Sequence, residues 1–125
     1  MDKKICLDTD ICIEILKNTD KGIHFLNFIE DKEVFITTIS VFELFLRERN
    51  FYPIEKLLFQ TSVLDFSELC ARRAAEINKD QKKRGNVIEL RDLFIASIAI
   101  VNNCTLATFN KKHFSNILNL DLLDF

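Results

Sequence analysis

The sequence is poor in the residues that loosen a polypeptide chain, with two glycines and one proline among 125 residues. Hydrophobic residues make up 48% and charged residues 29%, which excludes a low-complexity or disordered chain. No apolar run approaches the roughly 20 residues of a membrane span, and no signal-peptide pattern is present. We therefore expect a single cytoplasmic domain, residues 1–125, without a membrane partner.

A surplus of positive charge is also missing. The net charge is −2 at pH 7, so the chain lacks the broad basic surface of proteins that coat nucleic acids. The four cysteines are far apart, form no C-x-x-C pair and lie among apolar residues. Their spacing disfavours a zinc site and predicts reduced, buried thiols. Any binding of nucleic acid then requires a local site.

What the sequence does contain is a regular alternation of strand and helix patterns. Strands are predicted at residues 5–7, 33–37, 62–66 and 104–108, with a fifth within 117–123. Helices are predicted between them, at residues 10–17, 22–30, 38–47, 53–60, 67–84 and 90–103. This alternation predicts an α/β fold: a three-layer αβα sandwich whose central, mostly parallel sheet has four to five strands.

Polar residues at the starts of these helices predict where the helices begin. The expected N-caps are Thr9 or Asp10 for the first helix, Thr38 or Ser40 for the third, and Ser67 for the long helix. Gly85 takes the position after that long helix where a left-handed residue is usual.

Two acidic residues occupy positions where a carboxylate is expected to destabilise the fold unless it has a partner. Asp8 ends the first apolar strand, and ligands of parallel α/β sheets bind at the carboxyl ends of strands. Glu43 lies among apolar residues in a helix that is expected to have almost no solvent face, so its carboxylate needs a partner. The alternative for Glu43 is an ordinary surface glutamate on a helix whose other side is buried.

A third acid, Asp92, opens the apolar helix over residues 90–103. On its own, Asp92 reads as an acid stabilised by the helix dipole, or paired with Arg91 or Arg47. Together with the other two acids it makes a set of carboxylates that can reach one sheet edge. Because clustered carboxylates repel one another, and because oxygen ligands favour hard cations, the set predicts a Mg²⁺ or Mn²⁺ site suited to phosphoryl transfer.

Polar and basic residues near the last strand add to this edge. Thr108 and Asn110 follow the strand, although Asn110 could equally cap the next short helix. Arg91, Lys111 and Lys112 are candidate contacts for RNA phosphates. The basic run at 82–84 is better explained as a complement to the helix dipole, and His113 as a packing or hydrogen-bonding residue.

Four segments together resemble the PIN-domain superfamily, in particular the VapC-type toxin ribonucleases of toxin–antitoxin pairs. They are LDTD at 7–10, FEL at 42–44, RDLFIASIA at 91–99 and LATFNKKHF at 106–114, and the resemblance runs the whole length. It implies a PIN-like αβα fold and Mg²⁺- or Mn²⁺-dependent cleavage of RNA that leaves a 5′-phosphate and a 3′-hydroxyl.

The resemblance also implies roles for individual residues. Asp8, Glu43 and Asp92 match the catalytic, metal-binding acids, and Thr9 and Thr108 match supporting hydroxyl residues. Many members have a fourth acid where this chain has Asn110. The neutral amide supplies one charge less, so we expect one well-held ion.

The resemblance further implies a cognate antitoxin protein and a homodimer. Phe42, Phe45, Phe51 and Tyr52 crowd one pair of predicted helices. They could line a groove for the antitoxin or form a dimer face; the alternative is ordinary packing between the helices.

Two other functions remain open. The Asp8-x-Asp10 pair is similar to that of phosphatases that form an aspartyl-phosphate, but the glycine-threonine expected after the second acid is absent. A degenerate PIN fold could also act only as an RNA- or protein-binding module, without activity.

Overall fold

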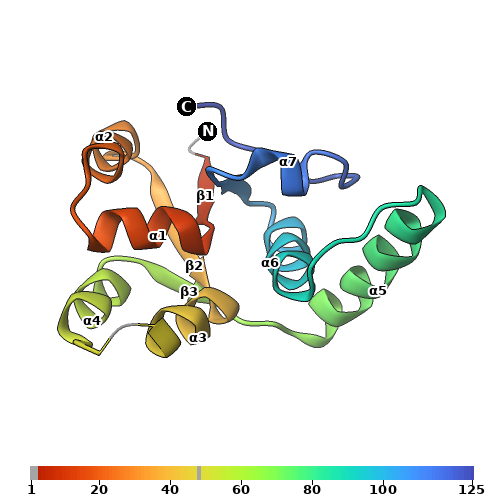
Figure 1. The fold of residues 1–125 in the computed structure, drawn as a ribbon, viewed down its shortest axis with the longest axis horizontal. Coiled ribbons are helices and arrows are strands. Elements are labelled where there is room, and N and C mark those ends of the chain that lie inside the picture. The colour runs from red at the N-terminus through yellow and green to blue at the C-terminus, as the bar shows by residue number, and fades with distance from the viewer. Residues whose placement is uncertain (1–2, 48) are drawn as a thin grey trace.

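The computed structural model describes residues 3–47 and 49–125 (Figure 1). Four strands, all parallel, form one sheet in the order β3-β2-β1-β4. The strands are β1 (Lys4–Leu7), β2 (Glu33–Thr37), β3 (Ser62–Leu64) and β4 (Thr105–Ala107). The helices are α1 (Thr9–Leu16), α2 (Asp20–Phe28), α3 (Thr38–Arg47), α4 (Tyr52–Phe59), α5 (Glu68–Lys83), α6 (Leu90–Val101) and α7 (Lys111–Phe114).

Both faces of the sheet are covered, which confirms the predicted three-layer sandwich. On β1, Ile5 and Leu7 pack into one core with residues of α1 to α4, whereas Cys6 packs into a second core with residues of α5, α6 and α7. Figure 1 shows α1, α2 and α4 on one side of the strands and α5 on the other, beyond α6. The absence of polar alternation in the first strand follows from this double coverage.

The predicted fifth strand is wrong. Leu122 makes only an isolated parallel bridge to Leu106. Two hydrogen bonds hold it, from Leu106 N to Asp121 O and from Leu123 N to Leu106 O. Asn119 takes a left-handed conformation (φ 69°), so residues 117–123 cannot run as one extended segment.

The helix starts differ from the prediction at the two places that matter for the site. The N-cap of α1 is Asp8, whose carboxylate accepts a hydrogen bond from Thr9 N at 2.8 Å. At the start of α3, Thr37 Oγ1 accepts from Ser40 N at 3.1 Å. Thr37 is the last residue of β2 and Asp8 directly follows β1, and each caps the next helix, so no connecting loop separates strand from helix.

The long helix ends as predicted. Ser67 Oγ accepts from Cys70 N, and Gly85 has φ 76°. Beyond the last turn of α5, Asn86 N donates to Gln81 O at 2.8 Å and Gly85 N to Lys82 O at 3.0 Å, the paired bonds of a Schellman motif.

The cysteines also agree with the prediction, since all four are free and buried: Cys6, Cys12, Cys70 and Cys104. Within residues 3–47 and 49–125, no helix has the length and hydrophobicity required to cross a bilayer.

Candidate active site

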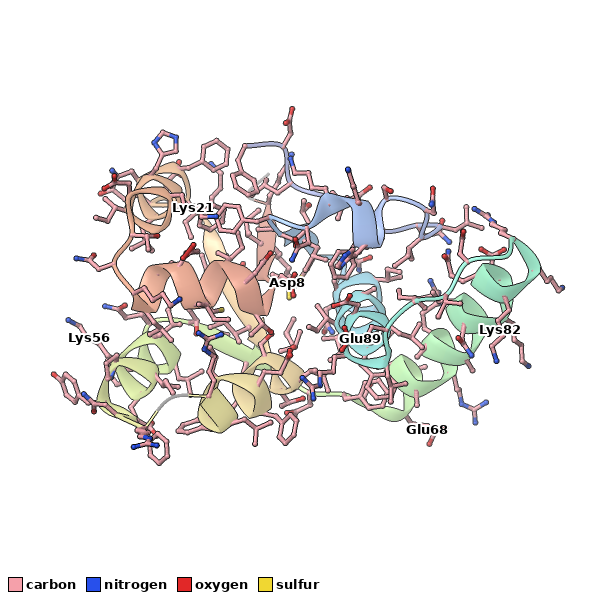
Figure 2. The ribbon with its side chains drawn as sticks, viewed as in Figure 1. Asp8, Lys21, Lys56, Glu68, Lys82 and Glu89 are labelled. Atoms are coloured by element: carbon pink, nitrogen blue, oxygen red, sulfur yellow. The ribbon has the colours of Figure 1, made fainter. Side chains whose placement is uncertain are left out.

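Asp8 lies at the carboxyl end of β1, where the strand passes directly into α1 (Figure 2). Its side chain is 6% exposed. Oδ1 accepts from Thr9 N at 2.8 Å, and Oδ2 accepts from Thr108 Oγ1 at 2.7 Å. Thr108 follows β4, the neighbouring strand, so the two strand ends are joined through this carboxylate.

Glu43 is tied to the same edge by Thr9. The Thr9 hydroxyl donates to Glu43 Oε1 at 2.7 Å and lies 2.9 Å from Ser40 Oγ. Glu43 Oε2 faces Arg91 Nη1 at 3.3 Å. Arg91 therefore pairs with Glu43 and not with Asp92, because α3 packs against α6 and brings its second turn, with Glu43, to the start of α6.

The expectation that α3 has almost no solvent face is wrong. Phe42 is 55% and Leu46 64% exposed, so the helix presents apolar side chains outward, while the side chain of Glu43 is only 20% exposed. Helices usually bury phenylalanine and expose glutamate, and α3 does the opposite. The reversal supports a functional role for the glutamate.

Asp92 stands in the first turn of α6, with its side chain 19% exposed. Its partner is His113 of α7, whose Nδ1 lies 3.5 Å from Asp92 Oδ2. Burial raises the pKa of Asp92, the charge of Glu89 raises it further, and His113 acts in the opposite direction. This contact agrees with the prediction of His113 as a packing or hydrogen-bonding residue.

The sequence suggests Asp10 as a helix cap or as the second acid of a phosphatase-like pair, and the structure adds it to this edge. Its Oδ2 accepts from Phe109 N at 3.0 Å and lies 3.4 Å from Thr108 Oγ1, while its Oδ1 is buried without a hydrogen-bond partner. The sequence carries a signal for this role of Asp10: it lies two residues after Asp8, at the start of a helix that packs on the sheet.

The carboxylates at this edge perturb one another. The pKa of Asp8 is raised to about 7, chiefly by burial and then by the charge of Asp10, with a smaller contribution from Asp92. The hydrogen bonds from Thr108 and Thr9 lower it only in part. Burial also raises the pKa of Asp10. Both donors to Asp8 are neutral groups, so they do not compensate its charge.

The three predicted acids thus share one edge, but they do not form a closed set of ligands. Among the described residues, no three His, Cys, Asp or Glu side chains are already arranged to hold a metal ion. The chemistry of the edge nevertheless fits a hard divalent cation. Its donors are carboxylate oxygens, Asp10 Oδ1 among them is buried without a hydrogen-bond partner, and the pKa of Asp8 is raised.

The remaining predicted residues lie around this edge. Asn110 donates its backbone N–H to Thr108 Oγ1 at 3.0 Å, and its side chain makes no capping hydrogen bond to α7. Lys111 Nζ lies 5.0 Å from the centroid of the Phe125 ring. Lys112 lines a cavity that also reaches Asp92. Contact of these basic residues with phosphate remains a prediction.

The aromatic residues of α3 and α4 divide between packing and surface. Phe45 packs edge-on against Phe51, with ring centroids 5.0 Å apart, and lies against the core of α1 to α4. Phe42, Phe51 and Tyr52 are 55%, 49% and 73% exposed. Packing therefore explains part of this group and leaves an apolar surface.

Comparisons of the sequence and of the fold with known proteins point to one family. A sequence model described as "PIN domain" matches residues 5–118. The chain is 33% identical to ribonuclease VapC2 of Rickettsia felis, over 93% of each chain, and 25% identical to the tRNA(fMet)-specific endonuclease VapC of Shigella flexneri, over 98% of each. Its fold is similar to a chain in the crystal structure of VapBC2 from Rickettsia felis bound to a promoter DNA fragment, with a TM-score of 0.86, 28% identity and 98% of each chain covered.

Proposed function

The chain belongs to the PIN-domain family, and on that premise we propose that it is an endoribonuclease toxin of the VapC type. It hydrolyses RNA phosphodiesters at the carboxyl edge of the sheet. Asp8, Glu43 and Asp92 are its catalytic and metal-binding acids.

The observation that carries this proposal is the chain of hydrogen bonds across the edge. It runs from Thr108 through Asp8 and the backbone of Thr9 to the Thr9 hydroxyl and Glu43. Four groups from three separate elements are thereby fixed relative to one another. Purely structural acids have no need of such an arrangement, because a buried carboxylate with neutral partners costs stability.

The cofactor we propose is Mg²⁺ or Mn²⁺, held by Asp8, Glu43 and Asp92. When bound, such a cation activates water and stabilises negative charge on a phosphate. One well-held ion is expected, since Asn110 is neutral. The supporting residues Thr9 and Thr108 keep the carboxylates in place through the bonds of 2.7 Å that they donate.

The other roles at this edge are proton transfer and contact with the RNA phosphates. We assign to Glu43 the acceptance of the proton of the attacking water; its contacts with Thr9 through Oε1 and with Arg91 through Oε2, which hold the carboxylate at this edge, support this role. Arg91 is half exposed and can contact an RNA phosphate on its open side. Lys111 and Lys112 supply further phosphate contacts.

The partners follow from the same family membership. The Rickettsia felis structure is a VapBC complex, which supports a cognate antitoxin for this chain. RNA is the substrate, and a tRNA is the first RNA to test because the Shigella flexneri relative is named for tRNA(fMet). A homodimer in the cytoplasm is our expectation, and the exposed Phe42, Phe51 and Tyr52 offer an apolar surface for it or for the antitoxin.

The decisive experiment is cleavage of end-labelled RNA by the purified protein in Mg²⁺, in Mn²⁺ and in EDTA. Cleavage should require metal and should fall at least about 100-fold in Asp8→Asn, since the variant removes a charge that holds the cation. Asp65→Asn is the matched control: Asp65 also follows a strand, β3, but it is exposed and lies outside the candidate site.

The same experiment decides between this function and the alternatives. A binding module without activity would retain RNA, yet it would cleave none in either metal. The phosphatase alternative loses its support through the family assignment, since its similarity was confined to Asp8 and Asp10.

A further inference from the structure

A cavity of about 410 Å³ opens beside Asp92. Its walls come from the end of α5, from the segment at 85–89 and from α7 with the residues that follow it. This volume falls within the range of about 300–1,000 Å³ that is typical of small-molecule sites. Asp92 and Lys112, which belong to the site described above, also line this cavity, and its other walls have no role in that site.

The cavity is held in shape by buried polar contacts. Gln81 is 4% exposed, and its Nε2 donates to Asn116 O at 2.8 Å. The carbonyl of Gln81 accepts from Asn86 N at 2.8 Å. Gln81 therefore holds the segment after α7 through its side chain, and the loop after α5 through its backbone carbonyl.

The charges around the cavity disfavour a phosphate inside it. Glu89 and Asp92 contribute two carboxylates, against Lys112 and a histidine, His113, that already faces Asp92 at 3.5 Å. The cavity thus has no surplus of positive charge. Its remaining polar groups include the amides of Asn86 and Asn116, which can donate and accept hydrogen bonds.

Glu89 has a carboxylate available for a ligand. It is the N-cap residue of α6, but its side chain makes no capping hydrogen bond. Figure 2 shows Glu89 at the start of α6, on the same central part of the molecule as Asp8. Beside it, Val87 is 99% exposed and Ile88 lines the cavity, so aliphatic groups are present to cover the face of a planar ring.

We propose, on the basis of the ribonuclease function above, that this cavity binds a guanine base of the RNA next to the scissile phosphate. Guanine presents two neighbouring donors, N1–H and N2–H, on its Watson–Crick edge, and the two oxygens of Glu89 can accept both. Adenine, cytosine and uracil lack such a pair of adjacent donors. Unstacked bases of single-stranded RNA are read in this way, by their edges and ring faces.

The first test measures cleavage of four RNA oligonucleotides that differ only in the base at one position beside the cleaved bond, on either side in turn. The wild type should cleave the guanine substrate preferentially, with a kcat/KM about tenfold or more above the others. Glu89→Gln replaces one acceptor by a donor, so it should remove most of this preference while metal-dependent cleavage continues.

Glu68→Gln is the matched control. Glu68 is an exposed glutamate in the first turn of α5, paired with Arg72 and drawn in Figure 2 at the end of α5 away from the cavity. It should leave the base preference unchanged. Melting temperatures of both variants, compared with the wild type, show whether either variant is unfolded.

The second test does not depend on cleavage. Guanosine and adenosine are titrated into the metal-free protein, and binding is followed by chemical-shift changes of the amides of Asn86 and Asn116. Guanosine should bind about tenfold more tightly than adenosine, and Glu89→Gln should abolish the difference.

The outcomes separate the two proposals. An uncut RNA under all metal conditions counts against the ribonuclease function. Cleavage without base preference, or a preference that survives Glu89→Gln, overturns the guanine site and leaves the ribonuclease function intact. Equal binding of the two nucleosides also overturns the guanine site.

Discussion

Replacing Asp8 by asparagine should raise the stability of the metal-free protein while it abolishes activity. The substitution keeps the shape of the side chain. Thr9 N can still donate to the amide oxygen, and the Thr108 hydroxyl can turn toward Asp10 Oδ2, which is 3.4 Å away. The change removes a charge at a residue that is 6% exposed.

The magnitude follows from the pKa of Asp8. Folding raises this pKa from 3.8 to about 7, a difference of roughly 3 units, and each unit corresponds to about 1.4 kcal/mol. Ionised Asp8 therefore lowers the free energy of unfolding by at most about 4 kcal/mol. Asparagine carries its own desolvation penalty, so we expect a net gain of about 2 kcal/mol, or roughly 8 °C in melting temperature.

The sign of the pH dependence can be worked out from the same shift. Below about pH 4 Asp8 is protonated in both the folded and the unfolded state, and its charge costs nothing. Between about pH 4 and pH 7 the unfolded state loses the proton first, so the stability of the wild type falls as the pH rises. The advantage of Asp8→Asn should thus be full at pH 8 and small at pH 4.

The assay is thermal unfolding in EDTA at pH 4, 6 and 8, repeated at pH 8 with Mg²⁺. Added Mg²⁺ should stabilise the wild type, because a ligand that binds only the folded state raises its stability. It should have little effect on Asp8→Asn. Asp65→Asn, at an exposed strand end, should stay within about 0.5 kcal/mol of the wild type throughout. A lower melting temperature for Asp8→Asn than for the wild type at pH 8 in EDTA would refute the reasoning.

Three further predictions concern the same edge and its support. Thr108→Val removes the 2.7 Å donor to Asp8 and should weaken Mg²⁺ binding in calorimetry by about tenfold, whereas Thr108→Ser should retain it. Asn110→Asp should tighten Mn²⁺ binding by restoring a charge, and an unchanged affinity would contradict our account of that position. Gly22→Ala should cost about 2–3 kcal/mol in chemical denaturation, because its Cβ would lie 2.3 Å from the carbonyl oxygen of Glu14; a variant as stable as the wild type would show that the two helices can move apart.

The sequence alone determined the layers of the fold and the sheet edge where the candidate site lies. Its alternating strand and helix patterns are local properties, and a strand without polar alternation has to be covered on both faces. Asp8 was placed at the carboxyl edge because it directly follows such a strand. Ser67 and Gly85 were predicted correctly for the same reason, since caps depend on a few neighbouring residues.

Only the tertiary structure decided which side chains meet. Arg91 pairs with Glu43, and Asp92 with His113, because the start of α6 packs between α3 on one side and α7 on the other. No local pattern encodes such distances. The absence of the predicted fifth strand also depends on tertiary structure, because a strand forms only where the chain can pair with a neighbour. Here Asn119 turns the backbone away from such pairing. Local residue preferences thus fix the elements, and packing between elements distant in sequence fixes the chemistry.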